Sequence, residues 1–183
     1  KTKITYDLNF NKTKLHIEDI YDISISSFPD FDVLTGGFPC QSFSIAGKRL
    51  GFNDGERGTL FYQIADILRL RKPKAFLLEN VKNLITHDNG DTFLTIQRTL
   101  KSLGYYLHYK VLNTKDYGVP QNRERIFLVG FTDDVPFTFP EPQPLTTTIQ
   151  DCLETCVSDD YYITPKHKHY QTIVDGVLKD DTI

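Results

Sequence analysis

The stretch Gly36-Gly37-Phe38-Pro39-Cys40-Gln41-Ser42-Phe43-Ser44 follows a short apolar run, residues 31–35, that predicts a β-strand. The two glycines predict that the backbone turns sharply out of this strand. Pro39 fixes its own backbone angle and favours an extended Phe38, so Cys40 is expected on a stiff turn at a strand end. Such a thiol is either a nucleophile or a small buried side chain, because free cysteine is often buried.

The remaining chain alternates predicted strands and helices. Apolar residues at helical spacing predict two helices, and runs of apolar and β-branched residues predict strands before, between and after them. A strand-loop-helix-strand order favours an α/β fold with a parallel sheet. The predicted strands cover 15–20, 31–35, 74–78, 105–113 and 125–131, and the predicted helices cover 58–72, 91–103 and, more briefly, 149–156.

Composition limits the class of protein. A chain of 183 residues suffices for a domain with a real core, and a net charge of −3 argues mildly against a surface devoted to nucleic acid while allowing a local basic cleft. No run of about 18 apolar residues and no signal peptide is found, which predicts a cytoplasmic protein without a membrane partner. Three cysteines without paired spacing predict neither a disulfide framework nor a metal site.

Charged residues recur where predicted strands end. Asp19 and Glu79 each follow a strand, and ligands gather at the carboxyl ends of strands in open α/β sheets. Asp19 is either a ligand for a ribose or an amine, or a turn aspartate. Arg123 and Arg125 share a face if the chain there is extended. Residues 45–57 form a basic, glycine-rich loop of a length typical of a functional lid.

Three of these segments occur together in one known family. Pro39-Cys40-Gln41, Glu79-Asn80-Val81 and Gln121-Asn122-Arg123-Glu124-Arg125 have the order and spacing of the cytosine-C5 DNA methyltransferase family, which the chain resembles from about residue 19 to 131. The resemblance implies a Rossmann-like, S-adenosylmethionine-dependent methyltransferase sheet. It also favours the nucleophile over the buried cysteine at Cys40.

The resemblance assigns a catalytic role to four residues. C5 of cytosine is a weak nucleophile, so the Cys40 thiolate would first add to C6 and make C5 electron-rich. Glu79 would protonate or hydrogen-bond N3 and accept from the N4 amine. Arg125 would hold the O2 side of the base, and Arg123 would contact phosphate or the catalytic loop. The base would have to be flipped out of duplex DNA.

The resemblance also implies binding residues. Asp19 and Ile20 would lie near the adenine of S-adenosylmethionine, the backbone of Gly37 and Pro39 near its methionine part, and Leu60 nearby. DNA contacts would come from the segment after Cys40. These expected DNA-binding residues are Gln41, Ser44, Lys48 and Arg49.

Several family features are not found in these 183 residues. They are the Phe-x-Gly-x-Gly turn, the acidic residue ending the second strand, and the last two motifs. We therefore expect a partial catalytic domain over residues 1–135, and a connector with the start of a target-recognition region over 136–183. The sheet would lack its first strands, which predicts an exposed edge, self-association and weak or no activity of this chain alone.

Three functions stay open. The first is methylation of duplex DNA by a bacterial-type modification enzyme, with a restriction-modification pair as its context. The second is the tRNA-methylating branch of the same family. The third is a non-catalytic nucleic-acid-binding fragment that needs a partner chain.

Overall fold

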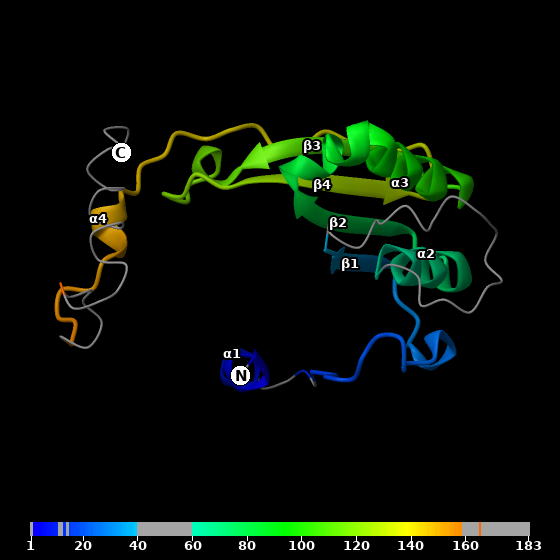
Figure 1. The fold of residues 1–183 in the computed structure, drawn as a ribbon, viewed down its shortest axis with the longest axis horizontal. Coiled ribbons are helices and arrows are strands. Elements are labelled where there is room, and N and C mark those ends of the chain that lie inside the picture. Colours follow the sequence, from blue (N-terminus) through cyan, green and yellow to red (C-terminus); the bar gives the residue numbers. More distant parts are fainter. Residues whose placement is uncertain (1, 11–12, 14, 40–59, 159–164, 166–183) are drawn as a thin grey trace. The chain divides into compact units, whose positions relative to one another are not determined.

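The computed structural model describes residues 2–10, 13, 15–39, 60–158 and 165. Contacts between α-carbons divide the chain into two compact units, residues 1–145 and 146–183. We describe each unit by itself. The first unit contains the sheet and its two long helices (Figure 1).

A four-stranded sheet forms the first unit, with the strand order β1-β2-β4-β3. The strands are β1 (Val33–Gly37), β2 (Ala75–Val81), β3 (Tyr106–Asn113) and β4 (Glu124–Phe131). β1 runs parallel to β2, whereas β4 is antiparallel to both β2 and β3. The predicted parallel sheet is therefore correct only for β1 and β2. Residues 114–123 are too few for a crossover helix, so β3 and β4 form an antiparallel pair.

The helices α2 (Leu60–Arg71) and α3 (Asp91–Ser102) confirm the two predicted helices. Both pack on one side of the sheet, which we call the covered face. Strand residues alternate between faces, so this side carries Phe76, Leu78 and Asn80 of β2. The buried core consists of Phe38, Phe61, Leu68, Phe76, Leu78, Leu84, Phe93, Ile96, Leu100, Tyr105, Ile126 and Leu128.

The helix ends follow backbone conformation. Lys72 has a φ of 47° and Gly104 a φ of 92°, and each left-handed residue directly follows the last turn of α2 or α3. At the start of α3, Gly90 occupies the cap position with no side-chain hydrogen bond, and Asp88 and Asn89 before it have left-handed backbone conformations.

We call the second side of the sheet the open face, because neither α2 nor α3 covers it. It carries Glu79 of β2 and Arg125 of β4, with Leu77 beside them at 39 % exposure. The predicted strand 74–78 continues to Val81, since pairing with β4 extends it. Glu79 therefore lies within the strand, whereas the sequence had predicted it at the end of the strand.

Gly36 and Gly37 were predicted to turn the chain, and this prediction is wrong. Both belong to β1, paired with Leu78 and Glu79 of β2. A Cβ on either glycine would only reach ordinary contact distance, 3.5 Å from Leu78 Cδ2 for Gly36 and 3.4 Å from Glu79 Oε2 for Gly37. The described segment leaves the strand only at Phe38.

The segment before β1 contains the helix α1 (Thr2–Asn9) and a short 3-10 helix, η1 (Ile25–Ser27). The strand predicted over 15–20 is wrong, since no described residue there is in a strand. Asp19 lies in a turn, where its carboxylate accepts a hydrogen bond from the Tyr21 N–H at 3.0 Å. A short side chain that bonds the backbone two residues on is typical of such turns.

After β4, the proline-rich connector folds back onto the β3–β4 pair. Phe137 stacks against His108 and Phe131, with ring centroids 5.3 and 5.4 Å apart, and the Tyr117 hydroxyl donates to the Pro140 carbonyl at 3.0 Å. In the second unit, α4 (Ile149–Cys152) is shorter than the helix predicted over 149–156. The assignment of 136–183 to a connector and target-recognition region stays a prediction.

Within the described residues, no helix has both the length and the apolar character that a membrane crossing requires. In the same part of the chain, no three His, Cys, Asp or Glu side chains gather as metal ligands would.

Candidate functional site

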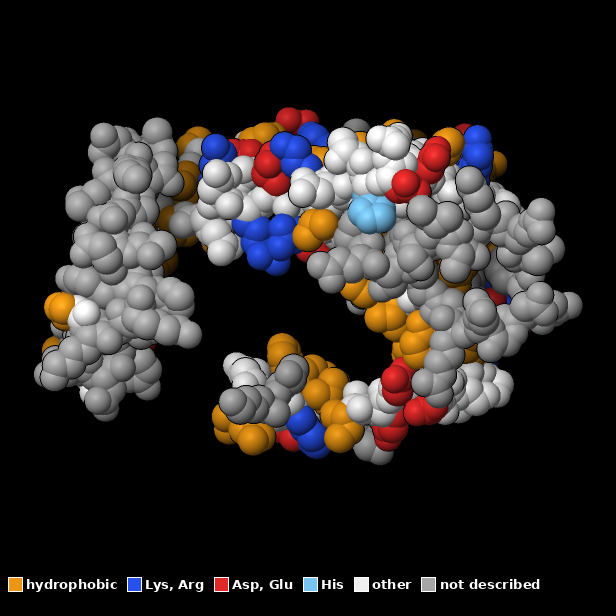
Figure 2. Space-filling model, in the orientation of Figure 1, with side chains coloured by type: hydrophobic (Ala, Val, Ile, Leu, Met, Phe, Trp, Pro, Cys, Tyr) orange, Lys and Arg blue, Asp and Glu red, His pale blue; other side chains and the backbone are white. Residues whose placement is uncertain are grey.

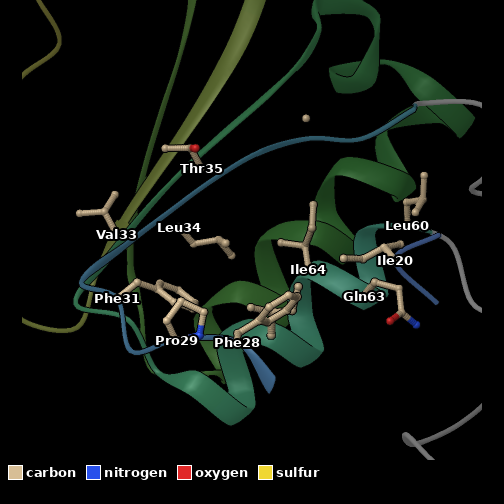
Figure 3. A pocket seen from close by; sticks show the side chains of 12 residues that line it. Ile20, Phe28, Pro29, Phe31, Val33, Leu34, Thr35, Leu60, Gln63 and Ile64 are labelled. Atoms are coloured by element: carbon tan, nitrogen blue, oxygen red, sulfur yellow. The ribbon is translucent and has the colours of Figure 1, made fainter. Parts of the chain in front are cut away.

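An apolar cavity of about 480 Å³ lies between β1 and α2 and is also lined by residues from the segment before β1. Figure 3 shows Phe28, Leu34 and Ile64 pointing toward one another, with Ile20 and Leu60 at one end. Among the described lining residues, only Thr35 and Gln63 add polar side chains. These described residues are Ile20, Phe28, Pro29, Phe31, Val33, Leu34, Thr35, Gly37, Leu60, Gln63, Ile64 and Ile67.

This apolar cavity brings together three of the five predicted cofactor residues, Ile20, Gly37 and Leu60. Asp19 precedes Ile20, and its carboxylate is engaged in the turn described above. Pro39 is exposed and does not line the cavity. A mostly apolar lining with few polar groups is typical of small-molecule sites.

Glu79 and Arg125 form an ion pair on the open face, with Glu79 Oε1 2.8 Å from Arg125 Nε. Glu79 pairs with Phe127 in the ladder, so Arg125 is its diagonal neighbour. Arg125 Nη1 also donates to the Glu124 carbonyl at 2.8 Å, which fixes the plane of the guanidinium. The sheet register therefore joins two residues that lie 46 positions apart, and the Glu79 side chain keeps 40 % exposure for a ligand.

A second, polar cavity of about 420 Å³ adjoins this ion pair at the end of β2 and the start of β4. Basic side chains stand beside hydrophobic ones where these strand ends lie in Figure 2. Arg123 and Arg125 both line this cavity, although Arg123 precedes β4 and is not on the strand. The lining is Val81, Lys82, Asn83, Gln121, Asn122, Arg123, Glu124 and Arg125.

Asn80 is a residue whose role the sequence did not reveal. It is 3 % exposed, and its Nδ2 donates to the Phe38 carbonyl at 2.8 Å while its Oδ1 accepts from the Val81 N–H at 2.8 Å. A buried amide needs such partners. Its signal in the sequence is a polar residue at a position where alternation predicts burial, after Phe76 and Leu78. Asn80 thus ties β2 to the segment that leads to Cys40.

Five predicted site residues lie outside the described residues, together with the predicted lid at 45–57. They are Cys40, Gln41, Ser44, Lys48 and Arg49. Their roles stay predictions. Phe38, two positions before Cys40, is described and buried at 6 % exposure.

Comparison with known proteins identifies the family. The family described as C-5 cytosine-specific DNA methylase matches residues 1–177. The chain belongs to this family. Relatives of this chain include the type II methyltransferases M.Bsp6I of Bacillus sp. (strain RFL6), 48 % identical over 98 % of this chain and 59 % of the relative, and M.HaeII of Haemophilus aegyptius, 52 % identical over 96 % of this chain and 54 % of the relative.

Solved structures share the fold. The Entamoeba histolytica methyltransferase EhMeth is 24 % identical with a TM-score of 0.68, and the match covers 88 % of this chain and 51 % of EhMeth. This confirms the predicted methyltransferase fold class. The chain spans about half the length of the relatives it matches.

Proposed function

We propose that this chain is the catalytic half of a DNA cytosine-C5 methyltransferase, which transfers a methyl group from S-adenosylmethionine to a cytosine flipped out of duplex DNA. The observation that carries the proposal is the Glu79–Arg125 ion pair beside a polar cavity, in a chain of the C-5 cytosine-specific DNA methylase family. The relatives are named type II methyltransferases, so we assign the whole protein to a restriction-modification system and to the bacterial cytoplasm.

The apolar cavity fits the cofactor that the family implies. A purine is flat and largely uncharged at its faces, and the Ile20 and Leu60 side chains offer apolar surface at one end of the cavity. Gly37, with no side chain, leaves room beside the backbone. S-adenosylmethionine, when bound there, supplies an activated methyl group. The role proposed for Asp19 and Pro39 needs them at the rim of the same cavity.

Beside the polar cavity, which Arg125 lines, the chain's own residues would prepare the base. The Cys40 thiolate adds to C6, Glu79 donates or hydrogen-bonds at N3, and Arg125 holds O2. After C5 has received the methyl group it loses its proton, and the C6–sulfur bond breaks to restore the thiolate. Arg125 supports this cycle because it keeps the Glu79 carboxylate oriented, at 2.8 Å.

A covalent-trapping experiment tests the proposal. The full-length gene product is mixed with S-adenosylmethionine and duplex oligonucleotides that carry 5-fluorocytosine. Fluorine at C5 replaces the proton whose loss normally releases the enzyme from the base, so the covalent adduct persists. Mass spectrometry is expected to show an adduct that is absent in Cys40→Ser. An adduct in that variant would contradict the role of Cys40. No adduct with any duplex, but one with a tRNA substrate, would favour the tRNA-methylating branch.

The 183-residue chain gives a second test. We expect it to form little adduct and to bind S-adenosylmethionine weakly in calorimetry, so micromolar affinity would contradict this expectation. β1 pairs with one strand only, β2, in the described sheet, and an unpaired edge favours association between chains. We therefore infer that this chain self-associates, which sedimentation at increasing concentration would show.

A further inference from the structure

Two ion pairs connect β2 with β4 at the same end of their ladder, and the acid and the base exchange sides between the two pairs. On the open face, β2 supplies the acid Glu79 and β4 the base Arg125. One step further, the base Lys82 follows β2 and the acid Glu124 begins β4, with Lys82 Nζ 2.9 Å from both Glu124 oxygens. The register places these residues opposite each other, since Val81 pairs with Arg125.

The second pair is joined to the first through the backbone. The Glu124 carbonyl accepts the Arg125 Nη1 hydrogen bond at 2.8 Å, so movement of Glu124 moves the acceptor that orients the guanidinium. The Glu124 side chain is in turn held by Lys82, the residue after β2 and the first of the 3-10 helix η4 (Lys82–Ile85). A continuous path therefore runs from Lys82 to the Glu79 carboxylate.

We propose that Lys82 and Glu124 are a positioning pair for the Glu79–Arg125 site, which rests on the function proposed above. Lys82 holds the Glu124 side chain, Glu124 presents its carbonyl to Arg125, and Arg125 aims the carboxylate that meets the base. Both residues line the polar cavity, and we assign them to the orientation of Arg125 rather than to contact with the reacting atoms. Loss of either charge therefore weakens catalysis by misorienting Glu79, and restoring an ion pair restores it.

The opposite end of the sheet provides a matched control. Lys74 and Asp32 also form an exposed ion pair between neighbouring strand ends, with Nζ 2.8 Å from Oδ1, but line neither cavity. Exposed pairs of this kind add little to stability. The side chains of Lys82 and Glu124 are 52 % and 43 % exposed, so their stabilising effect is expected to be equally small.

The test uses the full-length gene product with Lys82→Met, Glu124→Gln, the reversed pair Lys82→Glu with Glu124→Lys, and Lys74→Met. Each single change at the positioning pair is expected to lower kcat about tenfold with an unchanged KM for S-adenosylmethionine. The reversed pair should return kcat to within about threefold of the original protein, since the link is restored. Lys74→Met should leave kcat unchanged, and all melting temperatures should stay within about 3 °C.

The proposal is overturned if the single variants keep full kcat, if their loss follows a lower melting temperature, or if the reversed pair is as impaired as the single variants. The last result would mean that one of the two residues contacts substrate directly. A readout without activity separates this proposal from the proposed function. The Arg125 Nε–Hε resonance, assigned by its loss in Arg125→Lys, should exchange with water faster in Lys82→Met, and unchanged exchange would overturn the positioning role even in an inactive protein.

Discussion

Glu79 and Asn80 are neighbours on β2, yet their side chains have opposite surroundings. Glu79 reaches the open face, is partly exposed and pairs with Arg125, whereas Asn80 points to the covered face, is 3 % exposed and bonds only backbone groups. The alternation of a strand accounts for this difference. One strand can therefore present a reactive carboxylate on one side and hold the fold together on the other.

The largest effect should come from the open face. Glu79→Gln keeps the size of the side chain and removes its charge and its acidic proton, so kcat of the full-length protein is expected to fall by about 10²–10⁴. Because the pair is partly exposed, the melting temperature should change little. Steady-state methylation with radiolabelled S-adenosylmethionine and a thermal melt measure the two effects. Asp66→Asn is the control, since Asp66 also pairs with an arginine, Arg69, but lines neither cavity.

If Glu79→Gln strongly lowered the melting temperature as well as kcat, the loss of activity would follow from unfolding. The assignment of catalysis to the open face and of stability to the covered face would then be wrong. The same conclusion would follow if Asp66→Asn abolished methylation.

On the covered face, glycines test packing instead. A Cβ on Gly130 would fall inside the van der Waals surface of the Phe76 ring, so Gly130→Ala should lower the free energy of unfolding by about 1–3 kcal/mol. Gly36 is the matched control, because a Cβ there meets Leu78 and Ile64 at ordinary contact distances of 3.5 and 3.6 Å. Gly36→Ala is therefore expected to be neutral or slightly stabilising. Urea unfolding of both variants measures the difference, and equal effects would show that the Phe76 ring moves aside.

Asn80→Ala should follow in size, at about 1–2 kcal/mol of unfolding free energy, because it leaves the Phe38 carbonyl and the Val81 N–H without their partner. The same change frees the segment before Cys40, so adduct formation should slow more than the stability loss explains. Asn9→Ala is the control, since the exposed Asn9 amide also donates to a backbone carbonyl, that of Thr5 at 2.8 Å, but lines neither cavity. Normal adduct formation in Asn80→Ala at a temperature where the protein is folded would exclude this second role.

Sequence alone predicted the elements better than their arrangement. The periods of α2 and α3 are strong because each buries one stripe, and both helices were found. The direction of β4 was not predicted, since strand direction depends on pairing partners far away in the chain. For the same reason, the resemblance assigned a role to Glu79 and a role to Arg125 but did not predict their 2.8 Å contact. That contact depends on the register between β2 and β4.

The residues of the candidate site also fall into those that the sequence predicted and those that only the structure revealed. Ile20, Gly37 and Leu60 were assigned by resemblance, and the structure brings them to one cavity. Asn80, Lys82 and Glu124 received no role from the sequence because their partners lie about 42 residues away. Alternation along β2 predicts that Asn80 is buried, but it does not predict the partner.

The smallest effect should come from an apolar residue of the open face. Leu77 is 39 % exposed between Thr35 of β1 and Val129 of β4, so Leu77→Thr places a β-branched residue, which suits a strand, at a position that is only partly buried. In the 183-residue chain the free energy of unfolding should change by less than about 0.5 kcal/mol. Leu78→Thr, one position along and fully buried, should cost several times more. Equal losses at the two positions, measured by urea unfolding, would mean that the open face is as thoroughly packed as the covered one, and the distinction drawn between Glu79 and Asn80 would then rest on charge alone.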